Sequence, residues 1–273
     1  MGPFDRLLDR FGHWLAGRLE SETPGEEPFI PTDREALRRT LRTGDVLLVA
    51  GGSTLSTAIK YLTQSTWSHA ALYVGDVLDQ TAGNGEPHVL IEVTATEGCA
   101  SAPLSKYERF HTRICRPIGL TEADREALVT FMISRLGSKY DMRNIFDLAR
   151  YLMPTPPVPT RFRRRMIALG SGEPTRTICS TLIAEAFGRI AYPILPRVEL
   201  LMDEKGGITR FRQREILHIR HYSLYAPADF DLSPYFDIVK PTISEGFNYK
   251  GLRWASDDQG PAKMTETSRS RSA

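Results

Sequence analysis

Residues 67–75 read WSHAALYVG, and residues 88–93 read HVLIEV. In both stretches alternate side chains form two sets, as expected for strands that direct one set to each face of a sheet. The connection between them, residues 75–87, is rich in glycine and other turn formers. The pattern predicts an antiparallel hairpin. A histidine begins the first strand of this hairpin, and a glutamate lies inside the second.

The register of this hairpin determines how His69 and Glu92 meet. If Val74 pairs with Pro87, His69 lies directly opposite Glu92, and directly opposite residues have Cβ atoms about 4.5 to 5.5 Å apart. An imidazole and a carboxylate would then touch. The residues alone do not fix the register, so this pairing is a hypothesis.

Further strands and helices are expected on both sides of the hairpin. Continuous apolar runs and alternating patterns predict strands, and apolar residues three and four positions apart predict helices. Strands are expected at residues 46–49, 99–102, 112–116 and 218–222, and helices at residues 33–41, 53–62 and 121–136.

Another helix is expected from Cys179 onward, where the sequence reads CSTLIAEAFGRI. Cys179 lies in the first turn of this helix, where free backbone N–H groups and the positive end of the helix dipole favour a thiolate. His69 would act as the base that removes the thiol proton, and Glu92 would fix the tautomer of the imidazole. Together the three side chains predict acyl transfer through an acyl-enzyme, without a metal.

Each of these residues also has a purely structural interpretation. Cys179 shares its helical stripe with apolar residues, so it also fits a buried, unreactive cysteine. Glu92 in an apolar strand also fits a salt bridge to an arginine, because an unpaired buried carboxylate is costly. A single histidine such as His69 is more often part of a core than a catalytic base. The combination of the three residues is what favours chemistry.

Composition excludes several other classes of protein. The chain has 273 residues, of which 41% are hydrophobic and 25% charged, and its net charge is +2. Such a chain can form a core without disulfides, and its charge gives no general argument for nucleic acid binding. Three cysteines are too few and too widely spaced for a zinc ribbon. His218 and His221 would lie on opposite faces of a strand, so we expect no metal, and we expect no cofactor.

The order and spacing of five short motifs resemble a known family. The motifs are GDVLL (44–48), WSHAALYVG (67–75), IEV (91–93), GSKYD (137–141) and TICSTLIAEAF (177–187). They are similar to motifs of the permuted papain-like cysteine hydrolases, the circularly permuted branch of the NlpC-type superfamily that includes YiiX-like and YebB-like proteins. The order His, Glu, Cys is the permuted one.

The resemblance implies an α+β fold of the circularly permuted papain-like (NlpC-type) class, with a small antiparallel sheet or barrel packed against helices. It implies that Cys179 is the nucleophile, His69 the base and Glu92 the orienting acid. Trp67 and Tyr140 are candidate walls of the substrate pocket, although aromatic residues beside a motif are as often part of a core.

The resemblance implies substrates with amide bonds in cell-wall peptides and related amides, and lipid acyl bonds in distant relatives. We therefore expect a cysteine hydrolase that cleaves an amide or ester of a small peptide, lipid or other small molecule. The alternatives are an acyltransferase of the same fold and a non-catalytic binding or membrane-associated module. No pattern indicates an oligomeric state.

Three parts of the chain are expected to differ in structure. We expect an amphipathic helix and a linker in residues 1–31. We expect the hydrolase domain in residues 32–254 and a disordered tail in residues 255–273. The first helix either packs on the protein or contacts a membrane surface through residues 3–19, and its mixed charges favour packing. Residues 154–176 form an arginine- and proline-rich loop that suits an anionic substrate or simply solvent. We expect a cytoplasmic protein, with peripheral contact to the inner membrane face as the alternative.

Overall fold

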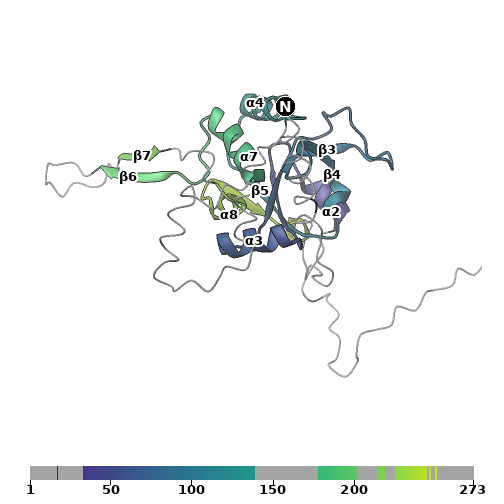
Figure 1. Cartoon of the computed structure of the whole chain (residues 1–273). Helices are drawn as coiled ribbons and strands as arrows, with labels where there is room; N and C mark the ends of the chain where they lie inside the picture. The colour runs from purple at the N-terminus through teal and green to yellow at the C-terminus, as the bar shows by residue number, and fades with distance from the viewer. Residues whose placement is uncertain are drawn as a thin grey trace, which may run out of the picture.

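The computed structural model describes residues 33–138, 178–201, 214–218 and 225–244, together with Gly17, Gly246 and Lys250. The expected N-terminal helix and membrane contact, the loop 154–176 and the expected tail lie outside the described residues. The description covers the strands and helices that carry His69, Glu92 and Cys179 (Figure 1).

A six-stranded sheet occupies the centre of the fold (Figure 1). Its strands lie in the order β4-β3-β2-β1-β5-β8, and every neighbouring pair is antiparallel. The strands are β1 (Val46–Ala50), β2 (His69–Tyr73), β3 (His88–Thr94), β4 (Gly98–Pro103), β5 (His111–Pro117) and β8 (Phe236–Val239). In the described part of the chain β4 and β8 are the two edges, so the sheet is open. The fold is α+β with an antiparallel sheet packed against helices, as expected, and of the two expected forms the described strands have the open sheet.

Helices pack against both faces of this sheet. They are α2 (Arg34–Thr40), α3 (Thr54–Thr63), α4 (Glu122–Ser134), α7 (Ile178–Arg189), α8 (Pro227–Leu232) and α9 (Pro241–Ser244), with a 3-10 turn, η1 (Leu104–Tyr107). One hydrophobic core lies between the sheet and α4, α7 and α8, and a second lies on the side of α2 and η1. Alternate residues of β1 belong to the two cores, which explains why this strand is apolar throughout.

The expected helices begin where their capping residues predict. The Ser53 side chain accepts a hydrogen bond from the Ser56 N–H at the start of α3. In the same way Thr121 accepts from the Asp124 N–H at the start of α4. Each bond satisfies a donor that has no partner inside the helix, which fixes the first turn.

The turn into β1 is held by a buried ion pair. Gly44 has φ +94°, a conformation that favours glycine, and a Cβ there would lie 3.1 Å from the side chain of Leu120. The next residue, Asp45, is buried and accepts hydrogen bonds from Arg116 of β5 at 2.7 and 3.0 Å. Arg116 also donates to the Thr40 carbonyl at 2.6 Å. The pair therefore ties α2, β1 and β5 together.

A separate two-stranded sheet projects from the body of the molecule (Figure 1). It pairs β6 (Arg197–Leu201) with β7 (Arg214–His218) in antiparallel register, with Arg197 opposite His218. The described strand β7 overlaps the strand expected at 218–222 only at His218, and residues 219–224 lie outside the described residues. The sequence patterns also missed α8 and β8, which are short and interrupted by proline and polar residues.

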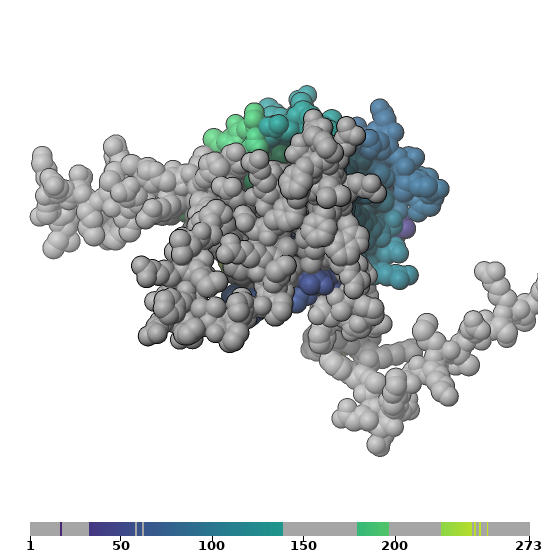
Figure 2. Space-filling view, viewed as in Figure 1, coloured from purple at the N-terminus to yellow at the C-terminus, as the bar shows by residue number. Residues whose placement is uncertain are grey.

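The described surface shows α7 beside α4 (Figure 2). Arg135, just after α4, donates to Glu185 of α7 at 3.1 Å, and Arg189 of α7 donates to the same carboxylate. This contact lies over the core face that α7 shares with β2 and β3. Packing of α7 against the sheet brings the start of the helix to the strands that carry His69 and Glu92.

Candidate active site

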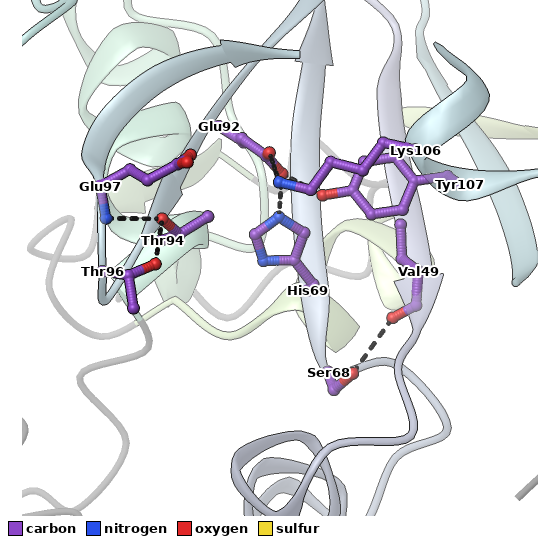
Figure 3. A network of polar contacts seen from close by, with 9 residues as sticks. All are labelled: Val49, Ser68, His69, Glu92, Thr94, Thr96, Glu97, Lys106 and Tyr107. Carbon is purple, nitrogen blue, oxygen red and sulfur yellow. Dashed lines mark hydrogen bonds and ion pairs between the residues drawn. The ribbon is translucent and has the colours of Figure 1, made fainter. Parts of the chain in front are cut away.

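His69 and Glu92 form a buried pair at the centre of the site (Figure 3). The His69 Nε2 atom lies 2.6 Å from the Glu92 Oε2 atom. The Glu92 side chain is completely buried, whereas 20% of the His69 side chain is exposed. The expected imidazole–carboxylate pair therefore exists, with the imidazole partly open to solvent and the carboxylate enclosed behind it.

The register that forms this pair is not the one expected from the sequence. Glu92 of β3 lies opposite Ala71 of β2, whereas the expected register placed it opposite His69. The pairing is thus shifted by two residues. Because side chains in a strand alternate with a period of two, this shift keeps His69 and Glu92 on the same face. They are diagonal neighbours, about 7 to 8 Å apart at the backbone, and the long glutamate side chain spans that separation.

Two further side chains bind the Glu92 carboxylate. Lys106 donates to Oε1 and the Tyr107 hydroxyl donates to Oε2, and both come from the turn η1. In Figure 3 they approach Glu92 from the side of η1, next to His69. The structural alternative for Glu92 was a salt bridge to an arginine, but the cations at this carboxylate are a lysine and the histidine.

Sequence reasoning missed Lys106 and Tyr107 because it treated residues 103–108 only as a turn. A signal was present in the sequence: a lysine and a tyrosine lie side by side between two apolar strands. Tyr107 is also almost fully buried, 5% exposed, and its ring lies 5.9 Å from the His69 ring. A buried tyrosine usually finds a hydrogen-bond partner for its hydroxyl, and here the partner is the carboxylate.

The charges around Glu92 hold it in the ionised form. Burial by itself raises the pKa of the Glu92 carboxyl, but the hydrogen bonds and charges of His69 and Lys106 outweigh burial and lower the pKa to about 2. An ionised carboxylate only accepts hydrogen bonds, so the His69 Nε2 atom must carry the proton in this pair. The other ring nitrogen, Nδ1, is then the atom that can exchange a proton with a nucleophile.

Cys179 is the second residue of α7 and interacts with His69. It lies in the first turn of the helix, as the sequence predicted, and is 3% exposed. Burial by itself lowers the pKa of His69, but the charge and hydrogen bond of Cys179, together with Glu92, outweigh burial and raise the pKa to about 10. The structure thus brings together the three residues that the sequence placed far apart in the chain, while their catalytic roles stay a prediction.

The other two cysteines lie in different surroundings. Cys99 in β4 and Cys115 in β5 are both buried strand residues, as expected. Burial raises the pKa of the Cys99 thiol to about 11 and also raises the pKa of Cys115. Both thiols are therefore held in the protonated, unreactive form.

The two expected pocket residues have different outcomes. Trp67 is 3% exposed, and its indole N–H donates to Asp231 of α8 at 3.0 Å. Its ring stacks on His111 at 5.4 Å and lies under the guanidinium of Arg113, which also binds Asp231. These contacts are those of a core residue that packs the segment before His69, and the substrate role of Trp67 stays a prediction. Tyr140 lies outside the described residues.

Among the described residues, no three histidine, cysteine, aspartate or glutamate side chains lie together as a metal site would require. The same residues include no helix long and apolar enough to span a membrane.

Comparison with solved structures finds a distant similarity. A crystal structure described as metalloprotein YiiX from Escherichia coli O157:H7 is 16% identical to this chain, with a TM-score of 0.43. The match covers 73% of this chain and 96% of that chain. No curated protein matches the sequence.

Comparison with protein families gives a match over residues 40–151. The family model is described as permuted papain-like amidase enzyme, YaeF/YiiX, C92 family. The matched region includes His69 and Glu92 and ends before Cys179. The match confirms the resemblance seen in the sequence motifs: residues 40–151 are similar to the permuted papain-like amidases, which supports an enzyme of the cysteine hydrolase class.

Proposed function

We propose that this enzyme hydrolyses an amide or ester bond through Cys179, His69 and Glu92. The observation that carries the proposal is the position of His69, which is bound by Glu92 at 2.6 Å through one ring nitrogen and interacts with Cys179 at the start of α7. A nucleophile, a base and a group that orients the base are the parts that covalent acyl transfer requires.

In the first half of the reaction, the His69 Nδ1 atom holds the proton of the Cys179 thiol. The thiolate attacks the substrate carbonyl carbon, a C–S bond forms, and negative charge develops on the carbonyl oxygen. The backbone N–H of Cys179, at the positive end of the helix dipole, is placed to stabilise that oxyanion. The C–N bond then breaks as His69 donates its proton to the leaving amine, which leaves a thioester on Cys179.

In the second half, water replaces the amine. His69 is now neutral and takes a proton from the water as the oxygen attacks the thioester carbonyl. The C–S bond breaks, the acid product leaves, and the proton returns to the Cys179–His69 pair. Glu92 keeps the proton on Nε2 in both halves, so that Nδ1 always faces the reaction. Atoms and charges balance with water as the only co-reactant.

The substrate class follows from the family and is a peptide or another amide. We propose a small peptide, or an amide or ester of a lipid or small molecule, because these share the carbonyl that the thiolate attacks. The proposed catalytic domain is residues 32–254, and residues 3–19 are the proposed contact if the substrate lies in a membrane.

The test uses two probes that need no knowledge of the natural substrate. Fluorescent iodoacetamide reports the reactivity of the Cys179 thiol, and p-nitrophenyl acetate reports acylation through release of p-nitrophenolate. The wild-type chain should release a burst of p-nitrophenolate and gain the mass of one acetyl group on Cys179. Cys179→Ala should lose both signals, and His69→Ala should slow acylation by about a hundredfold or more.

Cys99→Ala is the matched control, because it removes a thiol that is also buried but lies in the edge strand β4 and not in the first turn of a helix. It should react like the wild type. Equal acylation of the wild type and the folded Cys179→Ala variant would overturn the proposal, and so would a His69→Ala variant that keeps full acylation.

A further inference from the structure

The carboxylate of Glu92 accepts more hydrogen bonds than orientation of His69 alone requires. His69 Nε2 and the Tyr107 hydroxyl both donate to Oε2, while Lys106 donates to Oε1. Two of the three donors are consecutive residues of a single turn, η1, which lies between β4 and β5. The turn η1 therefore brings both donors to the same carboxylate.

The two donors contribute different properties to the carboxylate. Lys106 supplies a positive charge beside a side chain that is completely buried, and its own side chain is 39% exposed. Its Nζ atom also lies 5.8 Å from the centre of the Tyr107 ring. Tyr107 is buried against both Glu92 and the His69 ring. Lys106 therefore adds a positive charge that favours the ionised carboxylate, and Tyr107 adds a second donor to its Oε2 atom.

Two changes would stop a buried carboxylate from orienting a neighbouring histidine. The carboxylate can take up a proton, after which it can donate to Nε2 and no longer requires that this nitrogen be protonated. It can also rotate, so that Oε2 no longer accepts a hydrogen bond from the imidazole. A nearby cation opposes the first change because it favours the ionised form. A second donor on Oε2 opposes the second change because rotation would break its hydrogen bond as well.

We propose that Lys106 and Tyr107 are positioning residues of the proposed reaction: Lys106 keeps Glu92 ionised, and Tyr107 holds Oε2 against His69, so that the Nδ1 atom of His69 stays directed at Cys179. The inference rests on the proposed function of the three residues. It extends that function, because it makes the turn η1 part of the machinery that sets the protonation of the base.

The experiment measures the rate of Cys179 alkylation by iodoacetamide, and of acylation by p-nitrophenyl acetate, from acidic to neutral pH. The variants are Lys106→Met, Lys106→Arg and Tyr107→Phe in the full chain. Lys60→Met in α3 is the control for loss of one positive charge, and Tyr61→Phe, at a side chain that is 74% exposed, is the control for loss of one hydroxyl. Urea unfolding of every variant shows whether it is folded.

The expected result separates charge from orientation. Lys106→Met should lose reactivity at a higher pH than the wild type, because Glu92 takes up a proton more easily, and Lys106→Arg should restore the wild-type pH profile. Tyr107→Phe should lower the rate at neutral pH by about tenfold, the scale of one lost hydrogen bond to a charged group. Both controls should match the wild type.

Failure of this inference differs from failure of the proposed function. Wild-type rates and pH profiles in Lys106→Met and Tyr107→Phe would overturn the inference while Cys179→Ala and His69→Ala still lose acylation. An equal loss in Lys106→Met and Lys106→Arg without a shift of the pH profile would show a purely structural role and would also overturn it. Normal acylation of the Cys179→Ala variant would instead overturn the proposed function.

Discussion

Replacement of Glu92 by glutamine tests the electrostatic account of the site in a single step. Glutamine has almost the same shape, and its carbonyl oxygen can still accept a hydrogen bond from His69. It cannot carry the negative charge that Lys106 and His69 stabilise in the wild type. The substitution therefore removes charge while it leaves most of the packing in place.

The magnitude follows from the shift of the Glu92 carboxyl. Its pKa falls from 4.5 to about 2 in the folded protein. Each pKa unit corresponds to about 1.4 kcal/mol, so the ionised carboxylate contributes about 3 kcal/mol to the free energy of unfolding. Since folding lowers this pKa, the contribution is fully present above about pH 4.5 and is lost as the pH falls toward about 2.

The assay is urea unfolding of the wild type and of Glu92→Gln over a series of pH values. At neutral pH the variant should be less stable by about 3 kcal/mol, and the difference should shrink as the pH falls from about 4.5 toward about 2. Glu122→Gln is the control, because the Glu122 side chain is 85% exposed and its pair with an arginine contributes little. A Glu92→Gln variant as stable as the wild type at neutral pH, or a difference that does not change with pH, would refute the reasoning.

Three further predictions concern the thiols, the base and the turn before β1. Cys179→Ala should lower the pKa of His69 from about 10, because Cys179 contributes the largest of the effects that raise it; NMR titration of the imidazole measures this, and an unchanged titration would contradict it. Iodoacetamide should modify Cys179 in the native protein well before Cys99 and Cys115, because burial raises the pKa of both strand thiols; peptide mass spectrometry can show this, and equal modification of all three would contradict the protonated state of the strand thiols. Asp45→Ala should lower the free energy of unfolding by about 3 kcal/mol, since it leaves the partly buried Arg116 without its carboxylate partner; a loss below about 1 kcal/mol in urea unfolding would contradict that role.

The sequence predicted the parts of the site that lie in strands and helices, where side chains repeat with a regular spacing. The hypothetical hairpin register placed His69 and Glu92 on one face, and helical spacing placed Cys179 in a first turn; the structure has both features. The register was wrong by two residues because alternation has a period of two and cannot distinguish such a shift. His69 and Glu92 still meet, because a shift by an even number of residues keeps both side chains on the same face of the sheet.

The parts that the sequence could not predict depend on contacts between distant segments. Lys106 and Tyr107 lie in a four-residue turn that has no period, so no pattern indicated which side chains face the sheet. The edge strand β8 has an alternation of only four residues, and two of its side chains are exposed. Trp67 beside His69 suggested a pocket, but its partner Asp231 is 164 residues away in the chain.

The charges of the proposed site explain why a fourth ionisable residue, Lys106, accompanies the three residues proposed to be catalytic. With a thiolate on Cys179 and an imidazolium on His69, an ionised Glu92 would leave the buried group with one excess negative charge. The two anions would then share a single cation. Lys106 supplies the second cation at the far oxygen of the carboxylate. On this account Lys106 balances the charge of Glu92, so that the imidazolium of His69 balances the thiolate. The four side chains together then carry no net charge before the substrate is attacked.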